Sequence, residues 1–526
     1  MGCHSCIPFL PAPDQNVSSS IEIDQTPPIA RRAIRTLRMR HRFPIVPAMT
    51  RLETLFRPDT RRSGWLAGLI LILSFGGQTV SAQPSSFSLA PPAPPAGAKP
   101  YVADSRPEDG RHMALAFEKL DADLDPPRPL LIWALGSSYT ARLGTGDELI
   151  GLLQKRFGET KPILYRRMVG NSVPWQYLRG WARHLVIPDQ PDVIIIYTIG
   201  KPEDLDKLLT ELREHTTADI IVPSIHWRER GKPNWGRTED APDQKVSAVR
   251  EVCEKHGVEF VENRAEWASY MKASDLKIED LLSDAVHQSP FGAHIVNQNI
   301  VRHFNDPDEF SYDRLNREHR LTEEAGEYER LGNGFNVNFV GNRIDIIAWT
   351  RPDGGKLEVK LDDEPGSEAD AFFMTYIEPA PTNFQERRSP ARDQSPHGVT
   401  LGVDVVPQTW SITMLDDKGN FELSGSITGK DSRGNAFEAF VSDSGQILLD
   451  PEEWRRAERN RKGDKWTWNV VRSVLSEIDL LGGRTEKVRI TIAANLPNGE
   501  HSVELFPIGS GEIQVEGFDV FTPPLQ

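Results

Sequence analysis

Cysteine is scarce in this chain of 526 residues, which contains only three. Cys3 and Cys6 lie near the start of the sequence, and Cys253 is the third. The first two have the spacing of a metal or redox pair, but no second pair completes such a site, so we interpret them as incidental. A chain without residues 1–82 would keep one cysteine and could form no internal disulfide.

A hydrophobic run long enough to span a membrane is also missing. Residues 65–75 are apolar over about eleven positions, whereas a spanning helix needs about 20. An arginine-rich stretch precedes this run, and Val80-Ser81-Ala82 follows as a small-residue cleavage site. Residues 1–82 are therefore predicted to be a basic N-terminal segment and signal peptide, cleaved after Ala82, of a secreted or periplasmic protein. Because this is long for a signal peptide, Met49 is the expected start, and an uncleaved membrane anchor is the alternative.

The chain has no excess of positive charge, since its formal net charge is −15. Residues 1–82 contain ten arginines and five acidic residues, so the net charge without them is −20. This excludes nucleic acid as an expected partner, and a membrane is expected only if the N-terminal segment is uncleaved. No glycine-rich phosphate loop is present, and we expect no metal or organic cofactor.

Two folded regions are expected from the length and from the order of apolar and polar stretches. Residues 83–100 form a Pro/Ala/Ser-rich linker, and 101–304 alternate between strand and helix patterns, which predicts a three-layer α/β/α domain around a parallel sheet. The strands are expected at 130–135, 163–165, 193–198, 219–222 and 258–261, and helices at 147–157, from Ser172, from Pro202, at 245–256 and from Pro290.

The second region has the pattern of an all-β protein. After a charged linker at 305–332, residues 333–526 contain about a dozen short strand candidates separated by hairpin-type turns such as Asn498-Gly499. This predicts a β-sandwich of jelly-roll type. One stretch, 451–461, looks helical instead.

The stretch LLIWALGSSYT, residues 130–140, has the pattern of a nucleophile turn. A continuous apolar run ends in Gly136-Ser137-Ser138, so a serine is presented where a buried strand ends. The sheet would fix its backbone while the loop leaves its hydroxyl and nearby N–H groups accessible. The alternative is a polar turn that merely caps the next element.

Asp284 and His287, in the sequence DAVH, supply the other groups that a nucleophilic serine needs. A base must take the proton of the serine, and a carboxylate must orient that base. An acid three residues before a histidine on a tight loop can reach the imidazole by itself. A solvated surface Asp/His pair is the alternative, but the position after the last strand of the α/β pattern favours a site.

The strand followed by GSSYT, together with DAVHQSPFGAH near the end of the α/β region, resembles the GDSL-like, or SGNH, hydrolase family over roughly residues 128–304. The resemblance implies a nucleophile at Ser138, a base at His287 and an orienting acid at Asp284. It also implies that the backbone N–H groups of Ser138 and Gly170 stabilise the oxyanion.

The third sequence block departs from the family pattern. It normally reads Gly-x-Asn-Asp, with the Asn donating to the oxyanion, whereas this chain has Gly200-Lys201-Pro202 after the strand VIIIYT. Loss of one such donor costs about 10²–10³ in rate where it has been measured. Asn171 and Lys201 are the candidate replacements, although Asn171 could instead shape its own turn and Lys201 could be a plain solvated lysine.

The resemblance implies a secreted bacterial carboxylic ester hydrolase that removes O-acetyl or other acyl groups from a polysaccharide or oligosaccharide through an acyl-enzyme on Ser138. His226 and Trp227 are candidate substrate-binding residues at the same sheet edge, or a pair packed under a loop. A catalytically degenerate glycan-binding protein and an O-acyltransferase to sugar are the alternatives. Five tryptophans of the β region are candidate sugar-stacking rings, with core packing as the other interpretation: Trp349, Trp410, Trp454, Trp466 and Trp468.

Overall fold

The computed structural model describes residues 90–169, 180–197, 199–228, 241–307, 317–369, 371–375, 395–402, 404–454 and 456–525. The predicted N-terminal segment, its cleavage site and residues 83–89 of the predicted linker lie outside these residues. Among the described residues, no helix combines the length and the apolar character needed to cross a membrane.

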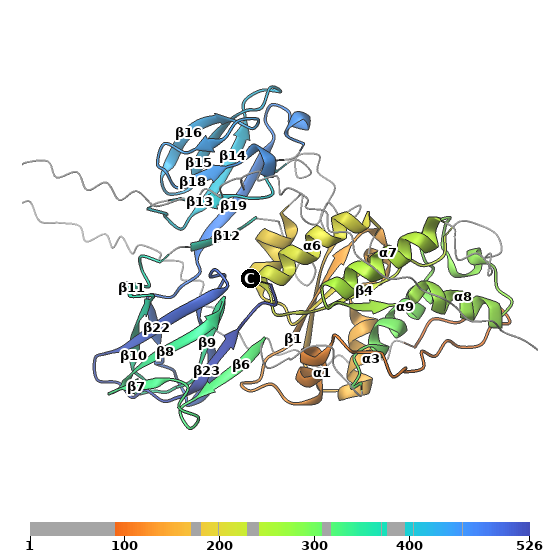
Figure 1. The fold of residues 1–526 in the computed structure, drawn as a ribbon, viewed down its shortest axis with the longest axis horizontal. Helices are drawn as coiled ribbons and strands as arrows, with labels where there is room; N and C mark the ends of the chain where they lie inside the picture. Colours follow the sequence, from red (N-terminus) through yellow and green to blue (C-terminus); the bar gives the residue numbers. More distant parts are fainter. Residues whose placement is uncertain are drawn as a thin grey trace, which may run out of the picture. The chain divides into compact units, whose positions relative to one another are not determined.

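A five-stranded parallel sheet forms the centre of the first region (Figure 1), and its pairing pattern places β1 next to β3 inside the sheet. Its order, β2-β1-β3-β4-β5, is the flavodoxin-like order of a doubly wound sheet. Strands β1 and β3 are short, buried apolar runs, as expected for strands covered on both faces, whereas the edge strand β2 contains Arg166 and Arg167. The strands are β1 (Leu130–Gly136), β2 (Ile163–Val169), β3 (Val193–Tyr197), β4 (Asp219–Pro223) and β5 (Glu259–Val261).

Alternate side chains of β1 enter two separate cores, one on each face of the sheet. Ile132 and Ala134 pack in a core that also contains residues of α3 and α9, whereas Trp133 and Leu135 pack in a core with residues of α6 and α7. The region is therefore the predicted three-layer α/β/α sandwich. Its longer helices are α1 (Ala114–Asp121), α3 (Asp147–Phe157), α6 (Pro202–His215), α7 (Ala241–Lys255), α8 (Asn263–Ala273) and α9 (Pro290–Arg302).

Glycine and proline residues in the sequence account for the ends of several of these helices. Helix α3 begins and ends where the sequence predicted, between Gly146 and Gly158. Pro202 occupies the first turn of α6, where a missing N–H costs nothing. Strand β2 is longer than predicted, α1 and α8 were not anticipated, and the helix expected from Ser172 lies outside the described residues.

The β region contains a sandwich of two antiparallel sheets that share one hydrophobic core (Figure 1). One sheet consists of β7 (Glu329–Leu331), β8 (Gly334–Gly341), β10 (Lys356–Leu361), β11 (Glu364–Pro365), β20 (Glu477–Asp479) and β22 (Gly499–Ile508). The other consists of β6 (Glu318–Thr322), β9 (Arg343–Thr350), β21 (Glu486–Ala493) and β23 (Val515–Phe521). Strands β6 and β7 lie in the stretch predicted as a charged linker, because β6 pairs with the distant C-terminal strand β23.

A second β unit is inserted between β11 and β20 and has its own core. The sequence prediction treated the whole of 333–526 as one sandwich and did not separate these two cores. The insertion carries β12 (Ala371–Thr375), β13 (Thr400–Leu401), β14 (Thr409–Met414), β15 (Asn420–Gly425), β16 (Gly429–Asn435), β17 (Phe440–Val441), β18 (Ile447–Leu449) and β19 (Lys465–Arg472). The stretch expected to be helical forms two short 3₁₀ turns, Pro451–Glu453 and Ala457–Arg459.

Four of the five tryptophans considered for sugar stacking are buried in the core of this inserted unit: Trp410, Trp454, Trp466 and Trp468. Their rings pack against neighbouring side chains and are not available to a ligand. Trp349, on β9, is half-buried, and the ammonium of Lys487 lies 5.4 Å from the centre of its ring.

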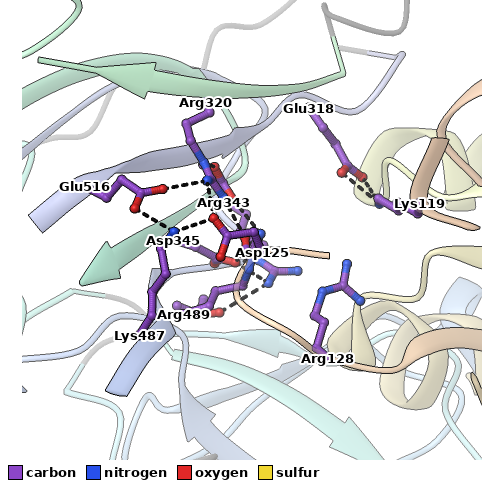
Figure 2. Close-up of polar contacts among 12 residues, drawn as sticks. Lys119, Asp125, Arg128, Glu318, Arg320, Arg343, Asp345, Lys487, Arg489 and Glu516 are labelled. Carbon is purple, nitrogen blue, oxygen red and sulfur yellow. Dashed lines mark hydrogen bonds and ion pairs between the residues drawn. The ribbon is translucent and has the colours of Figure 1, made fainter. Parts of the chain in front are cut away.

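Ionic contacts join the α/β region to the sandwich (Figure 2). The buried carboxylate of Asp192 accepts from Lys119 at 2.8 Å and from Arg128 at 2.6 Å, and Lys119 also binds Glu318 of β6 at 2.8 Å. Arg317 donates to Asp219 of β4 at 2.5 Å. The sandwich side of the network, joined to Asp125, is formed by Arg320, Arg343, Asp345, Lys487, Arg489 and Glu516.

Candidate active site

Ser138 lies where β1 ends, as the first residue of the short helix α2 (Ser138–Arg142). The Ser137 hydroxyl caps this helix by accepting from the N–H of Tyr139 at 3.2 Å. Gly136 is required at the turn, since a Cβ there would lie 2.3 Å from the carbonyl oxygen of Tyr197 on β3. The serine is thus held in place by the two central strands of the sheet.

Asp284 and His287 lie on a tight turn between η2 (Ile278–Leu281) and α9. The turn is closed by a bridge between Leu282 and Gln288 and by a hydrogen bond from the Ser283 N–H to the His287 carbonyl at 2.8 Å. Oδ1 of Asp284 accepts from the backbone N–H groups of Val286 and His287, each at 2.8 Å. This is the self-bonding that aspartate commonly makes in turns, and it directs the other carboxylate oxygen toward the imidazole.

The structure brings the three predicted groups together. Nε2 of His287 lies 2.8 Å from Oγ of Ser138, and Nδ1 of His287 lies 2.8 Å from Oδ2 of Asp284. Both distances are within hydrogen-bonding range for a serine, base and orienting acid. Ser138 is half-buried, whereas the side chains of His287 and Asp284 keep 26% and 48% of their surface exposed.

Gln288 connects the two segments directly. Its side-chain amide donates to the carbonyl oxygen of Tyr139 at 2.8 Å, so the residue after His287 binds the residue after Ser138 across 149 positions of sequence. Gln288 is buried. This bond restricts the separation between the serine turn and the Asp284–His287 turn.

The hydrogen bonds around Asp284 favour its ionised, carboxylate form. The N–H of His287, then the N–H of Val286 and the imidazole of His287, hold the pKa of Asp284 well below its usual range. Asp284 is therefore a carboxylate at neutral pH. In that state it accepts from Nδ1–H, which leaves Nε2 free to accept a proton from Ser138.

Not all of the residues predicted to form the oxyanion site lie among the residues that the structure describes. Gly170 and Asn171 lie outside the described residues. Lys201 is exposed and directly precedes α6, with no side-chain cap bond to that helix, and Pro202 occupies the place where the family pattern has its Asn. The backbone N–H of Ser138 is in the first turn of α2, where N–H groups have no acceptor within the helix.

The proposed substrate contact of His226 is contradicted by its burial, since its side chain is fully enclosed beneath the Asp284–His287 turn. Burial lowers its pKa to about 4, so the imidazole is neutral at pH 7. Trp227 is half-buried; its indole donates to the carbonyl oxygen of Arg264 at 3.0 Å, and the Arg264 guanidinium lies 3.6 Å from its ring centre.

Two residues beside the site were not singled out from the sequence. Tyr197, the last residue of β3, lies behind both turns, and the guanidinium of Arg228 donates to the hydroxyl of Tyr139 at 3.0 Å. The usable signal for Tyr197 was its position at the carboxyl end of a buried strand, where parallel sheets place their sites. No comparable signal existed for Arg228. Among the described residues, no group of three or more His, Cys, Asp or Glu side chains could hold a metal ion.

Comparison with known proteins gives similarity in structure only. No protein-family model matches the sequence, and no curated protein matches it. The chain is similar to an acetylxylan esterase from Geobacillus stearothermophilus, with 21% identity and a TM-score of 0.28, over 35% of this chain and 97% of that one. It is also similar to a two-domain esterase active on acetylated mannans, with 10% identity and a TM-score of 0.29, over 80% of this chain and all of that one.

The sheet order and the two turns together define the class. A serine after β1 and an Asp-x-x-His turn before α9 meet at one edge of a 2-1-3-4-5 parallel sheet. The α/β region thus has a three-layer, flavodoxin-like α/β/α fold, and β-sandwich structure follows it.

Proposed function

We propose that this protein is a serine esterase of the SGNH type that hydrolyses ester groups, O-acetyl above all, on carbohydrate. One observation carries the proposal: His287 lies 2.8 Å from both the Ser138 hydroxyl and the Asp284 carboxylate. Those contacts match the general-base arrangement that makes a serine hydroxyl nucleophilic.

The reaction begins with attack of Ser138 Oγ on the ester carbonyl carbon while Nε2 of His287 takes the hydroxyl proton. The C–O bond of the tetrahedral intermediate breaks, and His287 returns the proton to the leaving sugar oxygen. A water molecule then gives a proton to His287 and attacks the acyl-enzyme, which releases the acid and restores the serine. Asp284 keeps the imidazole oriented and stabilises its protonated form throughout.

The backbone N–H of Ser138 is the oxyanion donor that the described residues support. Gly170 is proposed as the second donor on the family pattern, and Asn171 or Lys201 as the replacement for the third donor, which the family pattern assigns to an Asn that is absent here. Pro202 provides neither a side-chain donor nor an N–H. A low turnover relative to enzymes with a complete oxyanion site is therefore part of the proposal.

Carbohydrate is proposed as the substrate class because the reacting groups are open to solvent. About half of the Asp284 side chain and a quarter of the His287 side chain are exposed, which suits an ester on a bulky, hydrophilic polymer. The substrates to compare are p-nitrophenyl acetate, acetylated xylan and acetylated mannan.

The decisive test is the Ser138→Ala variant of the full chain. Its kcat for p-nitrophenyl acetate should fall by about 10⁶-fold, the loss typical of removing a catalytic serine. Ser274→Ala, at the end of α8, is the matched control and should keep wild-type turnover. Unchanged turnover in Ser138→Ala would reject Ser138 as the nucleophile.

The same proteins separate the competing functions. A wild-type protein that binds acetylated xylan but forms no adduct with a fluorophosphonate probe would be a degenerate glycan-binding protein. A protein that labels with the probe and moves acetyl groups onto a sugar acceptor faster than it releases acetate would be an acyltransferase.

Export is proposed from the sequence of residues 1–82. Expression from Met49 in a Gram-negative host should yield extracellular or periplasmic protein whose N-terminal residue is Gln83. Ala82→Gln should block that cleavage, because signal peptidases need a small residue there. Recovery of the intact N-terminus in a membrane fraction would support the uncleaved anchor instead.

A further inference from the structure

A buried pair of side chains, Tyr197 and His226, lies directly behind the proposed catalytic groups. Nδ1 of His226 is 2.6 Å from the hydroxyl oxygen of Tyr197, and its Nε2 is 2.9 Å from the carbonyl oxygen of Val286. Both side chains are fully buried. Val286 lies between Asp284 and His287, so this contact reaches the centre of their turn.

The chemistry of the contacts fixes the direction of both hydrogen bonds. A carbonyl oxygen can only accept, so Nε2 of His226 carries the hydrogen and donates to Val286. Nδ1 is then an acceptor, and the Tyr197 hydroxyl donates to it. The hydroxyl of Tyr197 therefore selects the tautomer of His226 that can hold the Asp284–His287 turn.

The same tyrosine also holds the serine turn through its main chain. Its carbonyl oxygen accepts from the Thr140 hydroxyl at 2.6 Å, and Thr140 belongs to the helix that begins with Ser138. One residue at the end of β3 thus binds both halves of the site, one through its carbonyl and the other through its hydroxyl and His226.

Packing adds to this connection. The ring of His226 lies between Tyr139, at 4.7 Å between centroids, and Trp267, at 5.0 Å. Tyr139 follows Ser138 directly. A displacement of His226 would therefore move the backbone of the Asp284–His287 turn and the residue next to the nucleophile together.

We propose that Tyr197 and His226 are positioning residues that set the separation between the Ser138 hydroxyl and the His287 imidazole. The inference rests on the proposed esterase function for its kinetic consequence. Its structural consequence, the ordering of the Asp284–His287 turn, does not depend on that function.

His226→Phe in the full chain is the first test, because it keeps a ring between Tyr139 and Trp267 but removes both hydrogen bonds. The kcat for p-nitrophenyl acetate should fall by about 10²-fold, as expected for a misplaced catalytic group, with KM little changed. Peptides covering 283–288 should exchange amide hydrogens about 10-fold faster, since the bond to Val286 is lost.

Conservative variants separate positioning from a merely structural role. His226→Gln can still donate to the Val286 carbonyl and should keep kcat within about fivefold of wild type, unlike His226→Phe. Tyr197→Phe should lower kcat because the imidazole loses its tautomer partner. The double variant Tyr197→Phe/His226→Phe should be no slower than His226→Phe alone, because both act through one chain of hydrogen bonds.

His303→Gln is the matched control. His303 is buried, as His226 is, but it binds Glu259 and lies at the far end of α9. This variant should change neither kcat nor exchange at 283–288. Wild-type kcat and exchange in a folded His226→Phe would overturn the inference, as would additive effects in the double variant. Faster exchange in His226→Phe with an inactive wild-type protein would reject the esterase function and keep the ordering role.

Discussion

Two clusters of ionisable residues in this protein are built in opposite ways. Asp284 and His287 are three positions apart, partly exposed, and joined by bonds within one turn. Asp192, Lys119 and Glu318 come from distant parts of the sequence and meet at the contact between the α/β region and the sandwich, where Figure 2 shows Lys119 facing Glu318. The side chain of Asp192 is 3% exposed.

The two clusters therefore contribute to different properties, the exposed one to reactivity and the buried one to stability. An exposed local pair is worth little to folding, because water screens it and the turn forms by itself. A buried charge whose partner is removed is left without compensation, which is costly. We therefore expect the first cluster to be sensitive in rate and the second to be sensitive in free energy of unfolding.

The largest expected effect is that of Asp284→Asn on catalysis. The amide would favour the wrong tautomer of His287, and kcat should fall by about 10⁴-fold, as for the equivalent change in other triads. Urea unfolding should be almost unchanged. Asp280→Asn, a change at an exposed acid four residues earlier that accepts from the N–H of Lys277, is the control and should keep full activity. If Asp284→Asn lowered the free energy of unfolding as much as the loss of a buried ion pair does, the proposed difference between the two clusters would be wrong.

Asp192→Asn should give the reverse result. Lys119 and Arg128 hold the pKa of Asp192 below its usual range despite the opposing effect of burial. Removing this charge leaves two cations facing a neutral amide and should lower the free energy of unfolding by about 3–5 kcal/mol. Asp123→Asn, whose side chain is 99% exposed beside Lys161, should change it by less than about 1 kcal/mol. Equal values for the two variants in urea titrations would contradict this.

A smaller effect on the free energy of unfolding is expected when the pH is lowered. Burial holds the pKa of His226 and of His215 at about 4 in the folded protein, against about 6.5 when unfolded. The unfolded chain thus binds more protons between these values, and the stabilisation, complete above pH 6.5, is lost as the pH falls toward 4. The slope should reach about 1.4 kcal/mol per pH unit for each histidine.

Urea titrations at pH 7.0, 5.5 and 4.5 measure this slope, and His226→Phe should lower it by one histidine's share. Asp284 behaves differently, because its lowered pKa keeps it ionised well below pH 4. A pH-independent free energy of unfolding between 4.5 and 7.0 would contradict the lowered pKa of these imidazoles in the folded state.

Much of the α/β fold was predictable because its signals are local. Apolar runs such as 130–135, bounded by turn residues, favour strands covered on both faces, and helix α3 has its glycines and acidic first turn in sequence. The β region was less predictable. Short alternating strands do not reveal which partners they choose, so neither the separate core of 371–472 nor the pairing of β6 with β23 could be inferred.

In the candidate site, too, some residues could be predicted from the sequence and others could not. Ser138, Asp284 and His287 were found because each lies in a short pattern whose chemistry can be read locally. For His226 the sequence left a substrate contact and packing under a loop as alternatives, because its sequence position gives only the sheet edge, and the structure supports packing. Whether a side chain at that edge faces solvent or the core depends on the turn packed over it, and that turn lies 60 residues further along the chain.

The sequence by itself determined the buried strands, the serine turn after β1 and the self-bonded Asp284–His287 turn, because each is stabilised by residues a few positions apart. Only the tertiary structure decided that these turns meet, that Tyr197 and His226 lie behind them and that Lys119, bound to Asp192, reaches Glu318 of the sandwich. These features depend on contacts between residues dozens to hundreds of positions apart, which form only when the cores of the fold are packed.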